Sequence, residues 1–499
     1  MLDIRRATVS LVMIVRNEAH QLADCLAPVA TLFDQIVIVD TGSTDTTKAV
    51  AGQFTSQVID FPWCDDFAAA RNECLRHATG DWVFWLDADD RLSSENVAKL
   101  QLLLTGLDQG RRCYLMDTVC WSEFVSDGST LISHPRLFRR LENLRWAGRV
   151  HEQLRLLTGE TALDAVKCDV RIDHLGYQDR AMQQRKLQRN VRLLRMDYAI
   201  DPDDQSTLLH LGMSYLHLGR LGDAQEFLHK LIAAPTATGD HLRQVFASLA
   251  HVAIKQGNLA EALALLEQGT AKFPGEHYLQ YLHAECLYEI DEFAAARTIL
   301  LKIIESSDHA SYHGGIPGDV KQHLAPRRLA DVLRLEGDYA SAESLCRRLL
   351  VRYPRDTHAW HTLGRIYLDG GRQAELLRVV EQLRDCPDGH VFAALLLALW
   401  HIGKREFAAA TQQIDWLIAQ APRMPLPRLL RVELLTQTGA PIEERKKACR
   451  DALRLQPGNH DVMRILESLE AQPSAPPRPG QWPTLVLGAG IPTSATMPQ

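Results

Sequence analysis

The chain has 499 residues, a hydrophobic fraction of 46%, a charged fraction of 23% and a formal net charge of −7. This length exceeds one ordinary hydrophobic core, so we expect two or more domains, while the acidic balance argues against a nucleic-acid binder held by phosphate contacts. No apolar run approaches the roughly 20 residues that span a bilayer, so we expect no transmembrane segment.

From the N-terminus to about residue 175, short apolar runs alternate with amphipathic stretches. The runs are rich in β-branched or aromatic residues and nearly continuous in apolar character, which is typical of parallel strands covered on both faces. The predicted strands cover residues 10–15, 36–40, 57–61 and 82–87, and the predicted helices cover 18–31, 44–54 and 66–78. This alternation predicts a doubly wound α/β domain, in which ligands bind beyond the carboxyl ends of the strands.

The last of these strands runs into a cluster of acids. The segment VFWLDADDRL, residues 83–92, places Asp87, Asp89 and Asp90 after four apolar or aromatic residues. One interpretation is a solvated turn, because Asp favours turns and helix starts. The other is a site for Mg²⁺ or Mn²⁺, since these hard cations take oxygen ligands and keep open positions for phosphate oxygens.

After residue 200 the strand signals end and a repeat begins. Four small residues share one register at steps of 34, 46 and 34 residues, namely Ala250, Ala284, Ala330 and Gly364. The same register carries Ala262, Ala296 and Ala342 in the second half of each unit, turn glycines at Gly257, Gly337 and Gly371, and prolines at Pro274 and Pro354. A 34-residue helix–turn–helix unit with small residues at its crossings is the tetratricopeptide pattern, and about six or seven units are expected between 203 and 460. The competing interpretation is an irregular helical bundle, and the longer step predicts an insertion around 306–319.

These signals predict four segments. Residues 1–180 form the α/β domain, 181–202 a basic linker helix whose charge is expected to be a solvated face, and 203–470 the repeats. The segment 471–499 has seven prolines and one charged side chain, which predicts a disordered tail.

Five ordered motifs in the first domain carry a family resemblance. They are SLVMIVRNE, IVIVDTGSTDTT, FPWCDDFAAARNECLRHATGDWVFWLDADDRL, RLFRR and GRVHE. Together they resemble the family 2 glycosyltransferases of GT-A fold, in particular cytoplasmic members with C-terminal tetratricopeptide repeats. The resemblance covers roughly residues 8–180 and implies a GT-A domain followed by an all-α repeat solenoid.

The resemblance implies inverting transfer from a nucleotide sugar, assisted by a divalent metal, Mn²⁺ or Mg²⁺. In the D-x-D motif, Asp89 is expected to bind the metal and Asp87 to reach the ribose. Asp40 matches the aspartate that recognises the nucleotide base in relatives, although an Asx turn in DTGSTD is the alternative. Asn17 and Glu18 follow the first strand beside the expected base pocket.

Further site residues follow from the same resemblance. Arg71 lies where relatives use an arginine near the nucleotide, and its planar fork suits phosphate oxygens. Glu152 is the best match to the general base that takes the acceptor's proton. His174 is expected to complete the metal shell, with His151 as its competitor, and Asp117 is the next candidate for the base. Asp90 is expected to cap the following helix or to face the donor sugar.

Three functions remain open at this point. The leading hypothesis is a glycosyltransferase acting on a protein or peptide acceptor that the repeats recruit. The second keeps the enzyme but gives it a cell-envelope glycan or a lipid-linked sugar as acceptor, with the repeats serving docking or a homodimer. The third is a non-catalytic repeat scaffold. Ten cysteines without a C-x-x-C pair indicate reduced thiols, and no signal peptide is recognisable, so we expect a cytoplasmic protein.

Overall fold

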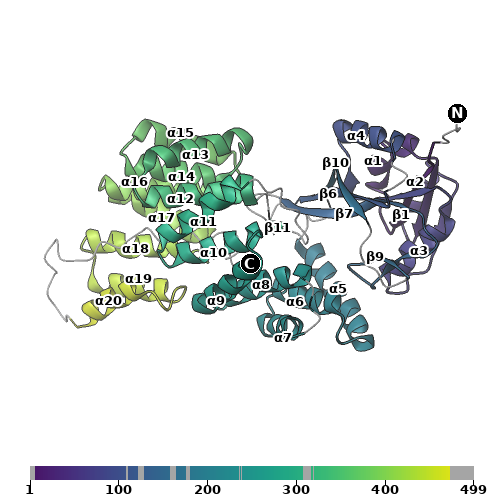
Figure 1. Ribbon diagram of the computed structural model, residues 1–499. Coiled ribbons are helices and arrows are strands. Elements are labelled where there is room, and N and C mark those ends of the chain that lie inside the picture. Colours follow the sequence, from purple (N-terminus) through teal and green to yellow (C-terminus); the bar gives the residue numbers. More distant parts are fainter. Residues whose placement is uncertain are drawn as a thin grey trace. The chain divides into compact units, whose positions relative to one another are not determined.

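The computed structural model in Figure 1 divides into two compact units, Met1–Leu279 with Asp308–Asp319, and Gln280–Ser307 with Val320–Gln499. It describes residues 6–107, 111–121, 129–157, 164–175, 180–234, 237, 239–306, 316–317 and 320–471. The expected tail lies outside these residues, apart from Ala471. The first unit joins an α/β domain to the first helices of the array.

A mixed β-sheet forms the centre of the first unit. Its strand order is β3-β2-β1-β4-β7-β6-β10-β5. The first four strands are parallel, as predicted, and comprise β3 Val58–Asp60, β2 Gln35–Asp40, β1 Val9–Val15 and β4 Trp82–Trp85. Beyond them the sheet turns antiparallel at β7 (Ser129–Arg139) and continues through β6 (Cys113–Trp121), β10 (Ala165–His174) and β5 (Asp90–Arg91). The predicted α/β fold and its four parallel strands are therefore confirmed, while the other half of the sheet, in which only β10 and β6 pair parallel among the described strands, was not predicted.

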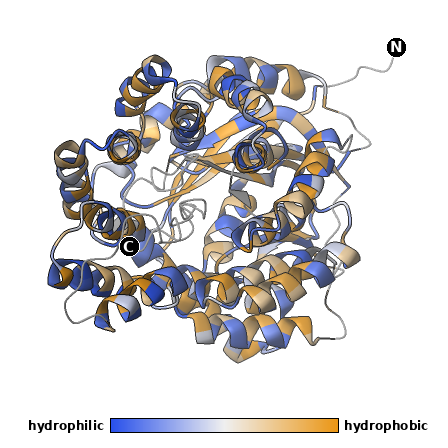
Figure 2. Ribbon diagram, turned by 90° about the vertical axis from the view of Figure 1, so that its left-hand side faces the viewer, coloured by the Kyte–Doolittle hydropathy of each residue, from blue (hydrophilic) through white to orange (hydrophobic). Residues whose placement is uncertain are grey.

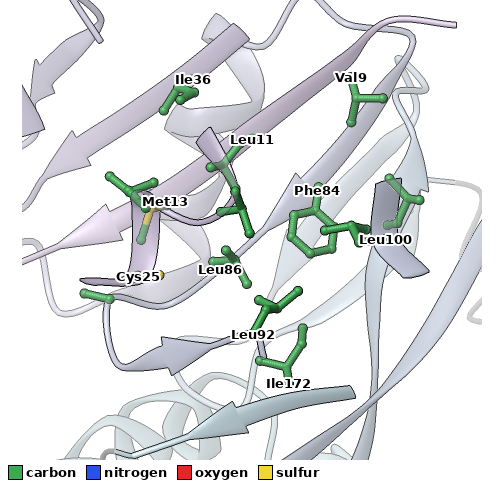
Figure 3. Close-up of a cluster of buried hydrophobic side chains, with 14 of the residues drawn as sticks. Val9, Leu11, Met13, Cys25, Ile36, Phe84, Leu86, Leu92, Leu100 and Ile172 are labelled. Atoms are coloured by element: carbon green, nitrogen blue, oxygen red, sulfur yellow. The ribbon is translucent and has the colours of Figure 1, made fainter. Parts of the chain in front are cut away.

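Hydrophobic side chains cover both faces of the parallel strands. In β1, Leu11 and Met13 join the cluster on one face, while Val12 joins the cluster on the other. Figure 3 shows the first cluster, in which Leu100 of α4 (Ser94–Thr105) and Cys25 of α1 (Leu22–Leu26) lie near the strands. The opposite face packs against α3 (Phe67–His77) and the hairpin of β8 (Leu144–Ala147) and β9 (Gln153–Leu156). The remaining short helices are Ala30–Leu32, a 3₁₀ turn, and α2, Thr47–Ala51.

The basic helix α5, Arg180–Ile200, packs onto the α/β domain. Arg192 forms a two-pronged ion pair with Asp65, and the Arg189 guanidinium lies 4.8 Å from the Phe67 ring centroid. Leu193 and Leu194 are buried in a core shared with the first helices of the array. Arg192 is exposed, as expected for a solvated face, but both arginines also contact the α/β domain.

The helical array begins in the first unit and continues in the second. The first unit contains α6 Gln205–His217, α7 Leu221–Ile232, α8 Gly239–Lys255 and α9 Leu259–Lys272. Helix α10, His277–Glu289, contains the boundary, and α11, Phe293–Glu305, follows it. The later helices are α12 Ala325–Leu335, α13 Tyr339–Arg352, α14 Thr357–Asp369, α15 Gln373–Arg384, α16 Gly389–Gly403, α17 Phe407–Gln420, α18 Pro425–Gln437, α19 Ile442–Leu453 and α20 His460–Glu470.

The predicted repeat register is confirmed in this array. Its small residues are buried where helices cross, as at Ala262, Ala296 and Ala342. At Gly364 an added Cβ would lie 2.4 Å from Leu396 Cδ1, so any larger residue there would force the Leu396 side chain to shift. The turn glycines Gly257, Gly337 and Gly371 all have positive φ. Helices of the array carry both hydrophobic and hydrophilic residues (Figure 2), as expected for a solenoid whose helices bury one side.

Part of the predicted insertion forms a strand. A single turn of π-helix, Val320–Leu324, precedes α12, and before it β11, Ile316–Pro317, pairs with β7 of the sheet. The remainder of the 306–319 segment after Ser306 lies outside the described residues. No helix within the described part of the chain has both the length and the apolar character needed to cross a bilayer.

Candidate active site

The acids after β4 fold into a tight turn at the carboxyl end of the parallel strands. All of Trp82–Trp85 is buried, and the turn closes when the Asp87 amide donates to Asp90 Oδ2 at 2.8 Å and the Asp90 amide donates to the Asp87 carbonyl at 3.0 Å. Asp87 and Asp89 are half-buried, whereas Asp90 is completely buried. The turn is thus held by one carboxylate, and the other two lie nearer the surface.

Asp90 belongs to a closed network of charges. Its carboxylate pairs with Arg136 at 2.7 Å and with His174 Nδ1 at 3.0 Å. Arg136 also donates to Thr118 Oγ1 at 3.1 Å, and its guanidinium lies 3.8 Å from the Trp85 ring centroid. Although burial alone would raise the pKa of Asp90, Arg136 and His174 hold it well below its usual range.

The structure contradicts both expectations for Asp90. The following helix α4 is capped by Ser93, whose hydroxyl oxygen accepts from the Asn96 amide at 3.3 Å. Asp90 has no exposed surface from which to face a sugar. Its role is to fix the turn and, through His174, to join β4 to β10.

Asp87, Asp89 and His174 converge as a possible ligand set. One donor atom from each lies within 4.8 Å of the other two. His174 reaches the acids because β10 and β5 pair antiparallel with His174 opposite Asp90, and its Nδ1 lies 3.3 Å from Asp89 Oδ1. The two carboxylates suit Mn²⁺ or Mg²⁺, and the imidazole, which is typically a ligand of transition metals, favours Mn²⁺ of the two. The residues present therefore fit the divalent cation that the sequence predicts.

The electrostatics of this cluster reflect crowded negative charge. Burial, together with the charges of Asp87 and Asp90, raises the pKa of Asp89 to about 6 against the lowering effect of His174. Burial lowers the pKa of His174, but its bond to Asp90 and the charges of the three acids outweigh that effect and raise it. A cation at this position would relieve the repulsion that raises the pKa of Asp89.

Arg71, on α3, links the acid cluster to the β8–β9 hairpin. It donates from Nη2 to Asp87 at 3.1 Å and from Nε to Glu152 at 2.5 Å. Its guanidinium lies 4.3 Å from the ring centroid of Trp85 and 5.2 Å from that of Trp146. Burial would lower the pKa of Arg71, yet the two carboxylates raise it, so the guanidinium stays charged.

The other candidates for the base and for the metal shell lie apart from the cluster. Asp117 accepts from Ser133 Oγ at 2.7 Å and pairs with Lys167 at 2.9 Å. The His151 ring instead stacks on His210 of α6, with ring centroids 4.1 Å apart. Among the described residues, His174 and not His151 is grouped with Asp87 and Asp89.

Asp40 ends β2 in a different setting. Its Oδ2 accepts from the amides of Gly42 and Ser43 at 3.1 and 2.9 Å, so the Asx turn considered as the alternative does form. Gly42 has φ +99°, which favours glycine. The second oxygen, Oδ1, is buried and has no hydrogen-bond partner in the described part of the chain. A buried acceptor of this kind is costly unless a ligand satisfies it.

Asn17 and Glu18 lie beside the Asp40 turn. Asn17 adopts a left-handed φ of 57°, its amide donates to Ser43 Oγ, and its side-chain oxygen accepts from the Thr44 amide at 2.8 Å. The Glu18 amide donates to Thr47 Oγ1 at 2.8 Å. These contacts fix the loop that carries Asp40.

Sequence reasoning missed the aromatic and cationic frame of the site. Trp85, Trp146 and Arg136 hold Arg71 and Asp90 in place, yet they occur in segments that read as strands and as a basic run. The only signal for Arg136 was its place in RLFRR, where nothing distinguishes it from the neighbouring arginines. Asn72 also exchanges two hydrogen bonds with the Trp146 backbone, at 2.9 Å each, and so braces the hairpin.

Family models match both parts of the chain. The model described as glycosyl transferase family 2 matches residues 10–153. Tetratricopeptide repeat models match residues 205–230, 253–315 and 327–366.

Individual proteins are similar to parts of this chain. A TPR repeat-containing protein of Synechococcus elongatus is 35% identical over 230 residues, which is 44% of this chain and 56% of that protein. The SPbeta prophage-derived glycosyltransferase SunS of Bacillus subtilis is 26% identical over 230 residues, 45% of this chain and 53% of SunS. The matched region thus spans little more than half of either relative. A tetratricopeptide repeat protein of Parabacteroides merdae, whose crystal structure is known, aligns with 53% of this chain at 15% identity and a TM-score of 0.44, covering 98% of that protein.

Proposed function

The chain carries a family 2 glycosyltransferase domain followed by tetratricopeptide repeats, and on this premise we propose that it is an inverting, metal-dependent glycosyltransferase acting on a protein or peptide acceptor. The donor is a nucleotide sugar, and the products are the glycosylated acceptor and a nucleoside diphosphate. The observation that carries the proposal is the convergence of Asp87, Asp89 and His174 at the carboxyl end of β4, within the matched domain and its continuation.

We assign the metal to Asp89 and His174, with Asp87 alongside them. Bound there, a divalent cation would supply Lewis-acid stabilisation of the charge that develops on the departing diphosphate. Asp90 and Arg136 hold the turn and the imidazole in position, because His174 Nδ1 is fixed by Asp90 at 3.0 Å. Such a support for a ligating imidazole usually increases metal affinity.

The donor's nucleotide would lie between the ends of β1, β2 and β4. Asp40 would accept from a ring N–H of the base with the buried Oδ1 that the protein leaves without a hydrogen bond among its described residues. Asn17 and Glu18 shape the wall of this pocket through the Ser43 and Thr47 contacts. Asp87 would contact the ribose, and the hydrogen bond from Arg71 would fix the Asp87 carboxylate in position.

The transfer step would use Glu152 as its base. The acceptor's nucleophilic atom attacks the anomeric carbon from the face opposite the diphosphate, the bond to the diphosphate breaks, and Glu152 takes the acceptor's proton. Arg71 binds one oxygen of Glu152, which fixes the direction of the carboxylate as an orienting group does in other base-assisted sites. The repeats would recruit the acceptor, because such solenoids present extended surfaces that bind polypeptides.

The proposal is tested by incubating the full-length protein and Mn²⁺ with a panel of nucleotide sugars. Release of nucleoside diphosphate is measured with and without a host cell lysate, and labelled products are identified by mass spectrometry. We expect one donor to be consumed faster in the presence of lysate and a protein to gain one sugar mass. Labelling confined to glycans or lipids would contradict the proposed acceptor, and consumption of no donor would contradict the proposed activity.

A further inference from the structure

The segment that carries Glu152 is built into the helices that follow it in the chain. It connects β8 to β9 and reads Gly148-Arg149-Val150-His151-Glu152, and we call it the base loop. Gly148 and His151 both have positive φ, 95° and 55°. A left-handed backbone at a histidine is strained, so contacts outside the loop must hold it.

Each of the three residues between Gly148 and Glu152 contacts α5 or α6. The Arg149 amide donates to Asp197 Oδ2 at 3.0 Å, and the Arg149 side chain pairs with the same carboxylate at 3.2 Å. Val150 is buried in the hydrophobic core of α5 to α8. The His151 ring lies nearly parallel to His210, at 10° and 4.1 Å.

The base loop also touches the α/β domain on its other side. The Phe67 amide, at the start of α3, donates to the Arg149 carbonyl at 2.9 Å, and the same helix carries Arg71, the partner of Glu152. The base loop therefore contacts α3 on one side and α5 and α6 on the other. All of these elements belong to one compact unit.

His210 itself has a fixed ring. Its Nδ1 lies 2.7 Å from the Ser206 carbonyl, one turn earlier in α6, so Nδ1 is the protonated nitrogen and the ring is anchored to its own helix. A ring anchored in this way can hold a strained neighbour in place by stacking. Asp197 holds Arg149 in place by accepting a hydrogen bond from its backbone amide and by pairing with its guanidinium.

We infer that Asp197 and His210 are positioning residues for Glu152, so that the first repeat is part of the catalytic unit as well as of the acceptor-recruiting array. This inference rests on the proposed function, because it assigns the effect to the candidate base. It adds to that function a physical link: whatever displaces α6 displaces the base loop, and the carboxylate at its end loses its orientation toward the acceptor.

The first experiment measures the base loop without relying on activity. Hydrogen exchange of the 148–152 amides is followed in the full-length protein and in His210→Ala, Asp197→Ala and His229→Ala. The last is the matched control, since His229 is an exposed histidine on α7 of the same repeat. We expect exchange to accelerate about tenfold or more in the first two variants and to stay unchanged in the control. Equal protection in all variants would overturn the inference.

The second experiment measures transfer with the donor found above. His210→Ala is expected to lower kcat about 10- to 100-fold with an unchanged KM for the donor, because only the direction of the base is lost. His210→Phe keeps a flat ring and should recover most of kcat. Equal defects in the Phe and Ala variants would show that stacking is not the cause, and would overturn the inference.

A double-mutant cycle distinguishes positioning of Glu152 from a general structural defect. If His210 acts through Glu152, then His210→Ala should cost nothing further in a Glu152→Gln background. A full additional loss would overturn the inference even if both single variants were impaired. Should the wild-type protein transfer no sugar at all, the proposed function fails, while the exchange experiment still decides whether the repeat positions the loop.

Discussion

Aspartates lie at the carboxyl ends of two parallel strands, Asp40 as the last residue of β2 and Asp87, Asp89 and Asp90 after β4, and the two ends are built differently. At β2, Asp40 is satisfied on one side only, by backbone amides, and its other oxygen is buried without a partner among the described residues. At β4, Asp90 is saturated by Arg136 and His174, which leaves Asp87 and Asp89 to project beyond it. A carboxylate at a strand end can therefore keep one buried oxygen without a hydrogen bond, as Asp40 does, or be saturated by cationic side chains, as Asp90 is.

The largest loss of activity is expected from Asp89→Ala, at the β4 end. We expect this variant to lose transfer and donor hydrolysis completely, because the cation that stabilises the leaving diphosphate would lose a ligand. Diphosphate release in Mn²⁺ measures the effect, and an excess of EDTA should reproduce it in the wild-type protein. Asp169→Ala, on the same strand as His174 and exposed at its side chain, is the control. Full activity of the wild type in EDTA would contradict the assignment.

The next largest loss of activity is expected from Glu152→Gln, which keeps the shape of the side chain and removes the proton acceptor. Transfer is expected to fall by about 10² to 10⁴-fold, the usual worth of general base catalysis. Affinity for donor and Mn²⁺, measured by calorimetry, should barely change. If the metal is lost in this variant instead, Glu152 belongs to the cation end of the site and the base lies elsewhere.

The support beneath the β4 end is tested by Arg136→Leu. Removing one partner of a buried ion pair leaves Asp90 uncompensated, and such losses cost about 3–5 kcal/mol of unfolding free energy. Denaturant unfolding monitored by tryptophan fluorescence measures this cost. Arg139→Leu, three residues later on the same strand, should cost far less because its side chain is only partly buried. Equal losses would mean that the strand, and not the Asp90 network, responds to the change.

The proposed role of the His174 imidazole as a metal ligand is tested by His174→Ala. We expect Mn²⁺ affinity to fall by at least about 10- to 100-fold, the loss that follows when even an outer-shell partner of a ligand is removed. Isothermal titration with Mn²⁺ alone, before any donor is added, isolates this effect. His151→Ala should bind Mn²⁺ normally, because its ring stacks on His210 away from the acids. The reverse result would exchange the roles of the two histidines.

At the β2 end, Asp40→Asn is expected to affect donor binding and not catalysis. The amide still offers an oxygen to Gly42 and Ser43, so the turn should survive, but its second position can no longer accept from a base N–H. A hydrogen bond to a charged group contributes about 1.5–3 kcal/mol, so the donor KM should rise by about 10- to 100-fold with little change in kcat. Competition by the free nucleoside diphosphate measures the same loss. A fall in kcat alone would place Asp40 with the chemistry of the β4 end.

Features of the fold could be predicted from the sequence where a residue pattern reports burial, and not where it does not. The parallel strands and the repeat register were predictable, because continuous apolar runs and recurring small residues report burial directly. The second half of the sheet was not, because β6, β7 and β10 mix polar with apolar residues. The run DADD could not reveal which acid would be buried, since Asp89 and Asp90 are adjacent and identical, and only pairing with Arg136 separates them. The roles of Asp40, Glu152 and His174 remain predictions.

The strand β11 can complete the sheet only late in the synthesis of the chain. It pairs with β7, yet β8 to β10 and helices α5 to α11 separate the two strands in the sequence. On the ribosome, domains generally fold from the N-terminus as they emerge, at about 5–20 residues per second. Here the last hydrogen bonds of β7 must wait until much of the helical array has been synthesised, so its free edge is exposed for many seconds. A chain that stalls or is cut within the array would leave that edge open to pairing with another molecule.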